Sequence, residues 1–473
     1  MFTLATRIGR ASTLALLLAA APAAGQNTND LNALDFSLPG ARSRGMGGAF
    51  VATADDATAT YSNPAGLNRL FRPEIAIEGR RWGLTSRIPN QGHAFGSPTG
   101  RGIDTIAGIQ EKAWEFNNTG LSFLSFIYPG DRWAVGVFHH QLVRYEMARA
   151  PQGPFFNCTG GFRDPVLTPT EPYCEPHARA DGVDREFPKR QTFDLNIRSL
   201  GGTFAYDVVD RLSVGVTLQY FDFEIASLNQ VFSARGEQKY LPADFSAGNL
   251  ELVSTQSGTD NALAANVGVL WDVSDRWSVG ASFRKGPKFT FQAHTVTGPA
   301  NLVGAGYVVA DEVDNPFRVP DTFALGVSFR PSPAWRVGVE YDRVQFSQLI
   351  EDFREVGTPE GDPEGQLFLR QVRLNDADQL RAGGEYALIF RNGFVLAMRG
   401  GAWYDPQHQT YFESDPSTGL PAPRWALLFP KGSGSMHWSG GLGFVLGQHL
   451  QVDASADFSD LVDTIAVSSV WRF

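Results

Sequence analysis

The chain has few of the features that mark soluble enzymes, nucleic-acid-binding proteins and helical membrane proteins. Only two of its 473 residues are cysteine, and acidic side chains outnumber basic ones, which gives a net charge of −10. This balance disfavours a nucleic-acid partner, because phosphates attract a basic face. Beyond the N-terminus no run of about 18 apolar residues occurs, so we expect no transmembrane helix.

The motifs of common catalytic sites are also absent. We find no G-x-S-x-G elbow, no H-E-x-x-H pair and no phosphate-binding P-loop. We therefore expect no enzymatic activity, no cofactor and no metal site.

The N-terminus is typical of an exported protein. Arg7 and Arg10 precede an apolar run from Leu14 to Ala21, and small residues follow up to Gly25. This three-part layout predicts a signal peptide over residues 1–25, because the apolar run is too short to span a bilayer as a helix. Export leads to an oxidising compartment, which favours a disulfide between Cys158 and Cys174. Two free thiols, or zinc bound with the help of His177, are the alternatives.

The C-terminal stretch alternates between two kinds of side chain. Ile465, Val467, Trp471 and Phe473 share one face of an extended strand, whereas Thr464, Ala466, Ser468 and Arg472 share the other. An apolar outer face and a polar inner face are typical of a membrane β-barrel. A C-terminal aromatic residue is the usual ending of bacterial outer-membrane barrels.

The same alternation recurs along the chain between short turns. An aromatic residue or leucine follows the turn in six places: Trp133, Leu212, Trp277, Trp335, Phe394 and Leu450. Such rings would lie at the membrane–water boundary, whereas in a soluble sandwich they would fill a core.

Counting these stretches predicts an antiparallel transmembrane β-barrel, all-β, of about fourteen strands over residues 74–473. The short turns would face the periplasm, and the long connections would face outward at 88–118, 148–191, 229–260, 298–319, 348–378 and 408–434. Residues 26–73 have no strand pattern. We name them the hatch, because a segment of this size could plug a cylinder that is too wide for side chains alone to fill.

The hatch contains the most specific motif in the chain. Residues 45–52 read Gly-Met-Gly-Gly-Ala-Phe-Val-Ala, residues 54–57 read Ala-Asp-Asp-Ala, and residues 63–67 read Asn-Pro-Ala-Gly-Leu. This combination resembles the N-terminal hatch of the FadL/TodX (OMPP1) family of outer-membrane transporters. The stretch Arg318-Val319-Pro320-Asp321-Thr322-Phe323 also resembles a strand entry of that family. The matching hatch residues include Gly45, Gly47, Gly48, Asn63, Pro64 and Ala65.

The resemblance implies a protein of the bacterial cell outer membrane that takes up hydrophobic compounds. Long-chain fatty acids are the expected substrates, with aromatic hydrocarbons in some branches of the family, and they would be captured in outer loops and passed beyond the hatch. The expected partners are hydrophobic small molecules such as fatty acids, together with outer-membrane lipid and lipopolysaccharide. A structural or secretion-linked barrel and a general diffusion porin are the alternative functions.

The family also has a lateral opening at a kink in its third strand, which corresponds here to residues 132–147. His139 and Gln141 fall in the lipid-facing register of this strand, where polar groups are costly. They mark the expected opening, unless a bulge turns them inward or the strand has already left the membrane.

Apolar residues of the outer loops are the expected ligand-binding groups. The candidate ligand-binding residues are Phe232, Phe245 and Phe317. The alternative is that these side chains only pack the loops. A fatty-acid carboxylate would favour a basic partner, for which Arg318 and Arg354 are the candidates.

Overall fold

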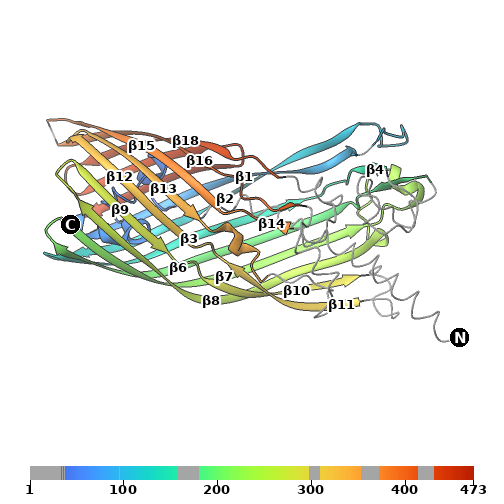
Figure 1. Ribbon diagram of the computed structural model, residues 1–473, viewed down its shortest axis with the longest axis horizontal. Helices are drawn as coiled ribbons and strands as arrows, with labels where there is room; N and C mark the ends of the chain where they lie inside the picture. The colour runs from blue at the N-terminus through green and yellow to red at the C-terminus, as the bar shows by residue number, and fades with distance from the viewer. Residues whose placement is uncertain are drawn as a thin grey trace.

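Fourteen antiparallel spans of β-strand form a closed barrel in the computed structural model (Figure 1). β1 (Glu74–His93) pairs on one side with β2 (Gly108–Pro129) and on the other with β20 (Val462–Arg472), which closes the cylinder. Closure removes the free edges that a sheet cannot expose to lipid. The structure describes residues 34, 36, 38–94, 96–157, 181–297, 309–352, 372–391, 393–413 and 431–473.

The other spans follow in chain order around the wall, each antiparallel to the next. They are β3 (Trp133–Arg149), β6 (Lys189–Val209), β7 (Leu212–Phe232), β8 (Leu250–Asp272), β9 (Trp277–Arg284) with β10 (Lys288–Thr297), β11 (Val309–Arg318) with β12 (Thr322–Ser332), β13 (Trp335–Val344), β15 (Ala377–Ile389), β16 (Phe394–Asp405), β18 (Ser435–Leu446) and β19 (Leu450–Phe458).

Two neighbouring spans are each divided into two strands. β9 and β10 both pair with β8, and β11 and β12 pair with β10 and β9 respectively. Pro287 and Pro320 lie in the two breaks, where a residue without an N–H group interrupts a hydrogen-bonded ladder. The backbone N–H of Val319 donates to Pro287 O at 3.0 Å, so the breaks contact each other.

Short elements occupy the connections. These are β4 (Phe155–Asn157), β5 (Val183–Arg185), β14 (Val372–Arg373), β17 (Tyr411–Phe412), η4 (Gly236–Tyr240), η5 (Ala247–Asn249) and η7 (Phe346–Leu349). In the described part of the hatch, α2 (Ala41–Gly45), α3 (Ala59–Ser62) and η2 (Pro64–Arg69) form the helices. Of the helices that the structure describes, none combines the length and the apolarity needed to cross a bilayer.

The strand faces follow the predicted alternation. On β20, Ile465, Val467 and Trp471 are exposed on the outside, whereas Thr464 and Ala466 are buried on the inside. The aromatic residues after the turns also face outward, and several of them contact a ring on the neighbouring strand, as Trp277 does with Phe329 at 4.3 Å and Trp335 with Tyr386 at 4.5 Å. The outer surface of the barrel is therefore apolar.

Several predicted connections are wrong in their bounds. The outer connection predicted at 88–118 is largely strand, because β1 extends to His93 and β2 begins at Gly108. In the same way β8 begins at Leu250 and β11 covers 309–318, within the connections predicted at 229–260 and 298–319. Strand that extends into water has no apolar face, so the alternation by which strands were recognised disappears there.

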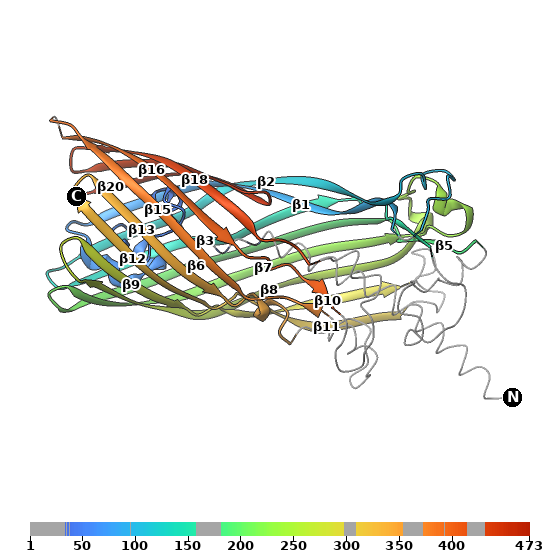
Figure 2. The ribbon, with the colours of Figure 1, turned by 45° about the horizontal axis from the view of Figure 1, so that its top comes forward.

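The described hatch lies inside the barrel, at the end that carries the short turns and the C-terminus. Both views show its helices enclosed by the wall at that end, while β1 and β2 extend far toward the other (Figures 1 and 2). The hatch precedes β1 directly, so the chain passes from the lumen into the wall at Glu74.

Candidate functional site

The hatch rests on inward-facing glycines of the barrel wall. At six of them a Cβ atom would lie less than 3.0 Å from a hatch atom, which leaves no space for any other residue: Gly215, Gly268, Gly280, Gly326, Gly383 and Gly401. At Gly383 it would lie 2.0 Å from Met46 O, and at Gly401 2.3 Å from Gly47 N. Gly47 and Gly48 themselves have positive φ values of 66° and 75°, which favour glycine. The glycine-rich hatch motif therefore has a packing role against the wall.

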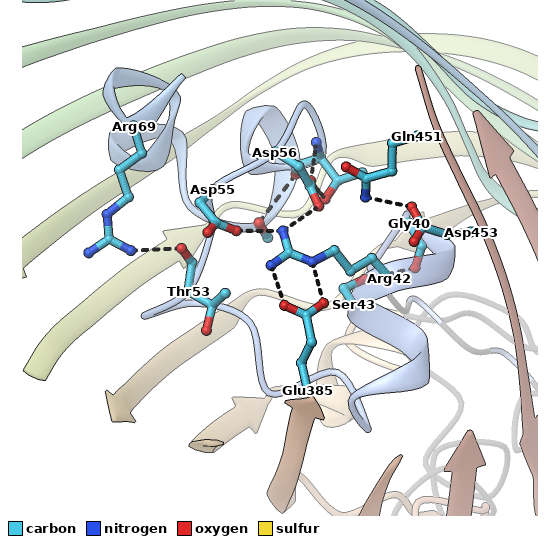
Figure 3. Close-up of polar contacts among 12 residues, drawn as sticks. Gly40, Arg42, Ser43, Thr53, Asp55, Asp56, Arg69, Glu385, Gln451 and Asp453 are labelled. Atoms are coloured by element: carbon cyan, nitrogen blue, oxygen red, sulfur yellow. Dashed lines mark hydrogen bonds and ion pairs between the residues drawn. The ribbon is translucent and has the colours of Figure 1, made fainter. Parts of the chain in front are cut away.

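Ion pairs hold α2 to the wall on one side. The Arg42 guanidinium donates to both carboxylate oxygens of Glu385 on β15, at 2.9 and 3.0 Å, and to Asp55 of the hatch at 2.6 Å (Figure 3). Arg336 on β13 donates to the other oxygen of Asp55 at 2.5 Å. Arg69 pairs with Asp272 of β8 and donates to Thr53 O at 2.7 Å. These contacts join the hatch to three different strands, β15, β13 and β8.

The two adjacent aspartates of this motif have opposite electrostatic environments. Burial alone would raise the pKa of Asp55, but Arg336 and Arg42 outweigh it and hold that pKa well below its usual range. Burial raises the pKa of Asp56, since Arg42 is farther away at 3.6 Å. Asp56 accepts hydrogen bonds from the backbone N–H and hydroxyl of Thr58 instead.

Hydrogen bonds to backbone groups fix the remaining turns of the hatch. Glu340 of β13 accepts from the backbone N–H groups of Phe50 at 2.6 Å and Val51 at 2.7 Å. The Asn63 amide donates to Val51 O at 2.8 Å and to Val269 O of β8 at 3.0 Å, and its oxygen accepts from Ala65 N. Asn63 and Pro64 thus begin η2 in a position that contacts both hatch and wall.

Beyond the hatch, the inner wall of the barrel is divided into an apolar and a charged half. The apolar half is made by β3, β6, β7, β10 and β11, whose buried inward side chains form one cluster: Phe138, Val143, Tyr145, Met147, Phe193, Leu195, Ile197, Phe221, Phe223, Ile225, Phe289, Phe291 and Phe317. The charged half includes Glu78, Arg80, Glu340, Asp342, Arg381, Arg399, His437, Asp453 and Asp457. An apolar molecule in the lumen would therefore contact the side that contains β3.

The barrel wall parts between β2 and β3. Their pairing runs from Pro129↔Ala134 to Phe123↔His140 and ends there, although β2 continues along β1 and β3 continues along β6. Each strand is irregular at this point: the register shifts at Ser122 in β2 and at Leu142 in β3. A bulge bends its strand and ends regular pairing, so the two bulges account for the parting.

The predicted residues His139 and Gln141 lie at this parting and are half-buried on the outward register of β3. Gln141 donates to Val143 O at 2.6 Å, to Asn196 Oδ1 at 2.8 Å and to Ile197 O at 3.1 Å, and so fills the bulge. Neighbouring His140 faces inward, is fully buried, and packs edge-on against Tyr61 of the hatch with ring centroids 4.4 Å apart. The adjacent residues His139 and His140 therefore border the opening and the hatch, respectively.

The structure separates the residues that were predicted to bind ligand. Phe232 at the end of β7 contacts Phe245 edge-on at 5.1 Å, and the Arg190 guanidinium lies over both rings. Phe317 is in β11, not in a loop, and its ring lies 5.4 Å from that of Phe223 within the apolar half of the lumen. Arg318 pairs with Glu351 and lies 3.8 Å from Asp321, so its charge is already balanced.

Some predictions fall on residues that the structure does not describe. Residues 1–25, Cys158, Cys174 and Arg354 lie outside the described residues. Within the described ranges, no group of three His, Cys, Asp or Glu side chains is arranged to hold a metal ion.

Sequence reasoning missed the wall side of the hatch contacts and the bulge in β2. Glu385 is separated from Arg42 by 343 residues, and a lumen carboxylate on a strand looks like any other polar inward residue. The glycines on the inner faces were visible, but nothing in their spacing indicated which of them would touch the hatch.

Comparisons with known proteins agree with this geometry. A family model described as outer membrane protein transport protein (OMPP1/FadL/TodX) matches residues 188–459. Two similar solved structures are toluene transporters. TbuX of Ralstonia pickettii has a TM-score of 0.51 and 16% sequence identity, and the match covers 93% of this chain and 99% of that one. TodX of P. putida has a TM-score of 0.54 and 14% identity, and the match covers 93% of this chain and 99% of that one. A Pseudomonas aeruginosa FadL homologue has a TM-score of 0.54 and 13% identity, and the match covers 90% of this chain and 96% of that one. None of the curated proteins matches significantly.

These identities are low, so the solved structures establish the fold: a fourteen-strand barrel with an N-terminal hatch. The family model covers more than half of the chain and establishes the relationship. The chain belongs to the OMPP1/FadL/TodX family of outer-membrane transport proteins.

Proposed function

We propose that this protein takes up long-chain fatty acids across the outer membrane and releases them sideways through the parting between β2 and β3. Family membership gives the coarser function, transport of hydrophobic compounds through an outer-membrane channel. The path and the substrate are the proposal. In it, Phe245 and the outer residues around it capture the molecule, and the apolar half of the lumen leads it to His139. Phe232 is buried and packs against Phe245.

The observation that carries the proposal is the end of β2–β3 pairing at Phe123↔His140. The apolar half of the lumen includes the inward face of β3 directly beside it. An apolar solute gains by moving along such a surface, because each apolar group that it covers leaves water. The hatch closes the other route, since its helices occupy the lumen at the periplasmic end. A direct aqueous path, as in a diffusion porin, is therefore disfavoured.

Replacing His139 with tryptophan tests the exit. The indole would fill the parting from the outward register of β3, so uptake should fall about tenfold or more while binding in the lumen stays unchanged. The measurement is uptake of a labelled long-chain fatty acid by a Gram-negative host that lacks its own transporter of this family. Val137→Trp is the matched control, because Val137 lies on the same face, 56% exposed, where β2 and β3 remain paired.

Wild-type uptake in the His139→Trp strain would contradict the lateral exit. Uptake of a monoaromatic hydrocarbon but not of a fatty acid by the wild type would contradict the proposed substrate and leave the proposed exit path in place. Uptake of neither would favour a structural or secretion-linked barrel.

A further inference from the structure

The barrel wall has a second parting, between β8 and the divided span of β9 and β10. Counted from the periplasmic turn, β8 pairs with β9 as far as Asn266↔Arg284, and it pairs with β10 only from Ser257↔Gln292 onward. The ladder therefore omits residues 258–265 of β8, all of which lie within the described ranges. A bulge leaves one extra residue unpaired, so this longer stretch is a gap in the ladder.

The break that follows β9 explains the second parting. Gly286 donates its backbone N–H to Asp321 Oδ1 at 2.8 Å, and Pro287, which has no N–H, accepts from Val319 at 3.0 Å. The two breaks are so close that a Cβ at Gly286 would lie 1.8 Å from Val319 O. The backbone groups of this segment are therefore bonded to the neighbouring span and not to β8.

The inner side of the second parting is apolar. Ala262 and Ala264 are the inward residues of β8 at this point, and both belong to or pack against the apolar cluster of the lumen. Because they are small, the ring of Phe289 on β10 reaches across β8 and stacks on Phe223 of β7 at 4.6 Å. Phe289 is fully buried. Its ring therefore covers the parting on the side of the lumen.

The outer side of the second parting begins in the apolar surface of the barrel. Leu263 lies within the unpaired stretch on the outward register and is 78% exposed, whereas the next outward residue, Asn261, is polar. Nearer the outer end, the Asp260 carboxylate accepts from the backbone N–H of Thr290 at 2.8 Å. This side chain replaces a ladder bond and places a negative charge in the parting.

Both partings lie at the same height in the wall. His140 of β3 and Arg284 of β9 are the last paired residues, and each lies seven residues after the tryptophan that follows a periplasmic turn, Trp133 or Trp277. Seven residues of a tilted strand rise about 18 Å, and the apolar band of such barrels is about 25 Å tall. The second parting therefore faces the outer leaflet of the membrane.

We propose that the second parting is an entry by which uncharged apolar molecules dissolved in the outer leaflet reach the apolar half of the lumen, with the Phe289 ring as its inner gate. Such molecules accumulate in lipid because they leave water. A carboxylate is disfavoured here, since it would enter the apolar band and approach Asp260. The inference rests on the proposed uptake function and adds a second substrate class with its own route.

The test is photolabelling from the lipid phase with an iodinated aryl diazirine, an uncharged apolar probe that dissolves in bilayers. The purified full chain is placed in vesicles of phospholipid and lipopolysaccharide, and labelled residues are located by mass spectrometry. Phe223 and Phe289 should be labelled although both are buried. Leu263→Trp places an indole over the parting and should remove most of this labelling. Val267→Trp is the matched control, because Val267 is 49% exposed on the same face, opposite Phe283, where β8 and β9 pair.

A second variant should have the opposite effect. Phe289→Ala removes the gate, so labelling of Phe223 should increase. Heat-dependent migration on gels shows that each variant forms the barrel. Unchanged labelling in Leu263→Trp, or its loss in His139→Trp instead, overturns entry at the second parting, and unchanged labelling of Phe223 in Phe289→Ala overturns the gate.

The labelling separates this entry from the proposed uptake function. A wild type that takes up fatty acid but is not labelled in the lumen overturns the entry alone. A wild type that takes up neither a fatty acid nor a hydrocarbon overturns the uptake function, and the transport role of the second parting with it.

Discussion

At the scale of single residues, the inward glycines show how little space separates the hatch from the wall. Gly401 and Gly400 are neighbours on β16, yet a Cβ at Gly401 would lie 2.3 Å from Gly47 N, whereas at Gly400 it would meet nothing within 4 Å. The pair allows the effect of one methyl group on the hatch to be measured against an internal control.

We predict that Gly401→Ala displaces the hatch and that Gly400→Ala does not. The added methyl group should destabilise the seated hatch by about 1–3 kcal/mol, the usual cost of overpacking. Single-channel conductance in planar bilayers should therefore rise for Gly401→Ala and remain at the wild-type level for Gly400→Ala. Equal conductance of the two variants would show that the hatch does not depend on this contact.

The lowered pKa of Asp55 predicts how the hatch responds to acid. A carboxylate with a lowered folded-state pKa stabilises the folded state fully above its ordinary pKa, about 3.9, and loses that contribution as the pH falls toward the lowered value. Conductance should therefore stay constant from neutral pH to about pH 5 and rise only in strong acid. Burial raises the pKa of Asp56, so its protonation under mild acid favours the folded state.

Asp55→Asn removes the charge at every pH and should give raised conductance already at pH 7. Asp275→Asn is the control, because Asp275 is 89% exposed in a turn where it pairs with Arg211. A rise in wild-type conductance between pH 7 and pH 5 would assign the closure of the lumen to a different titrating group.

At the scale of elements, the strands that cross the membrane could be predicted from the sequence, and those beyond it could not. Lipid on one side and water on the other impose alternation, which is legible in β12, β13 and β20. The outer part of β2 is mostly exposed, and its apolar residues do not alternate regularly with polar ones, so it has no such signature. The sequence indicated the bulge at Leu142 only as one alternative explanation of the polar residues His139 and Gln141. An extra residue shifts the alternation of apolar and polar side chains, but it does not show where the pairing of β2 with β3 ends.

We predict that the hatch, as one element, closes the lumen. A variant that lacks residues 38–69, with the signal region joined to the segment before β1, should form the barrel and conduct much more strongly than the intact chain. The reason is that the removed residues supply α2, α3 and η2, whose contacts occupy the lumen. A large, steady conductance in the intact chain would instead support a diffusion porin.

At the scale of the whole molecule, the lumen is two-sided, and this could not be read from the chain. Phe223 on β7 and Phe289 on β10 are separated in the wall by β8, with which both strands pair, yet their rings stack at 4.6 Å. The hatch motif, in contrast, was recognisable because its residues are contiguous.

The six wall glycines that contact the hatch also determine when the hatch is able to fold. They lie on β7, β8, β9, β12, β15 and β16, and the pair formed by Arg42 and Glu385 spans 343 residues. Contacts between residues so distant in sequence form slowly, because the intervening chain must be ordered first. The binding surface for the hatch is incomplete until β16 has joined the wall. The segment that precedes the barrel in the chain therefore completes its native contacts only after most of the wall has formed.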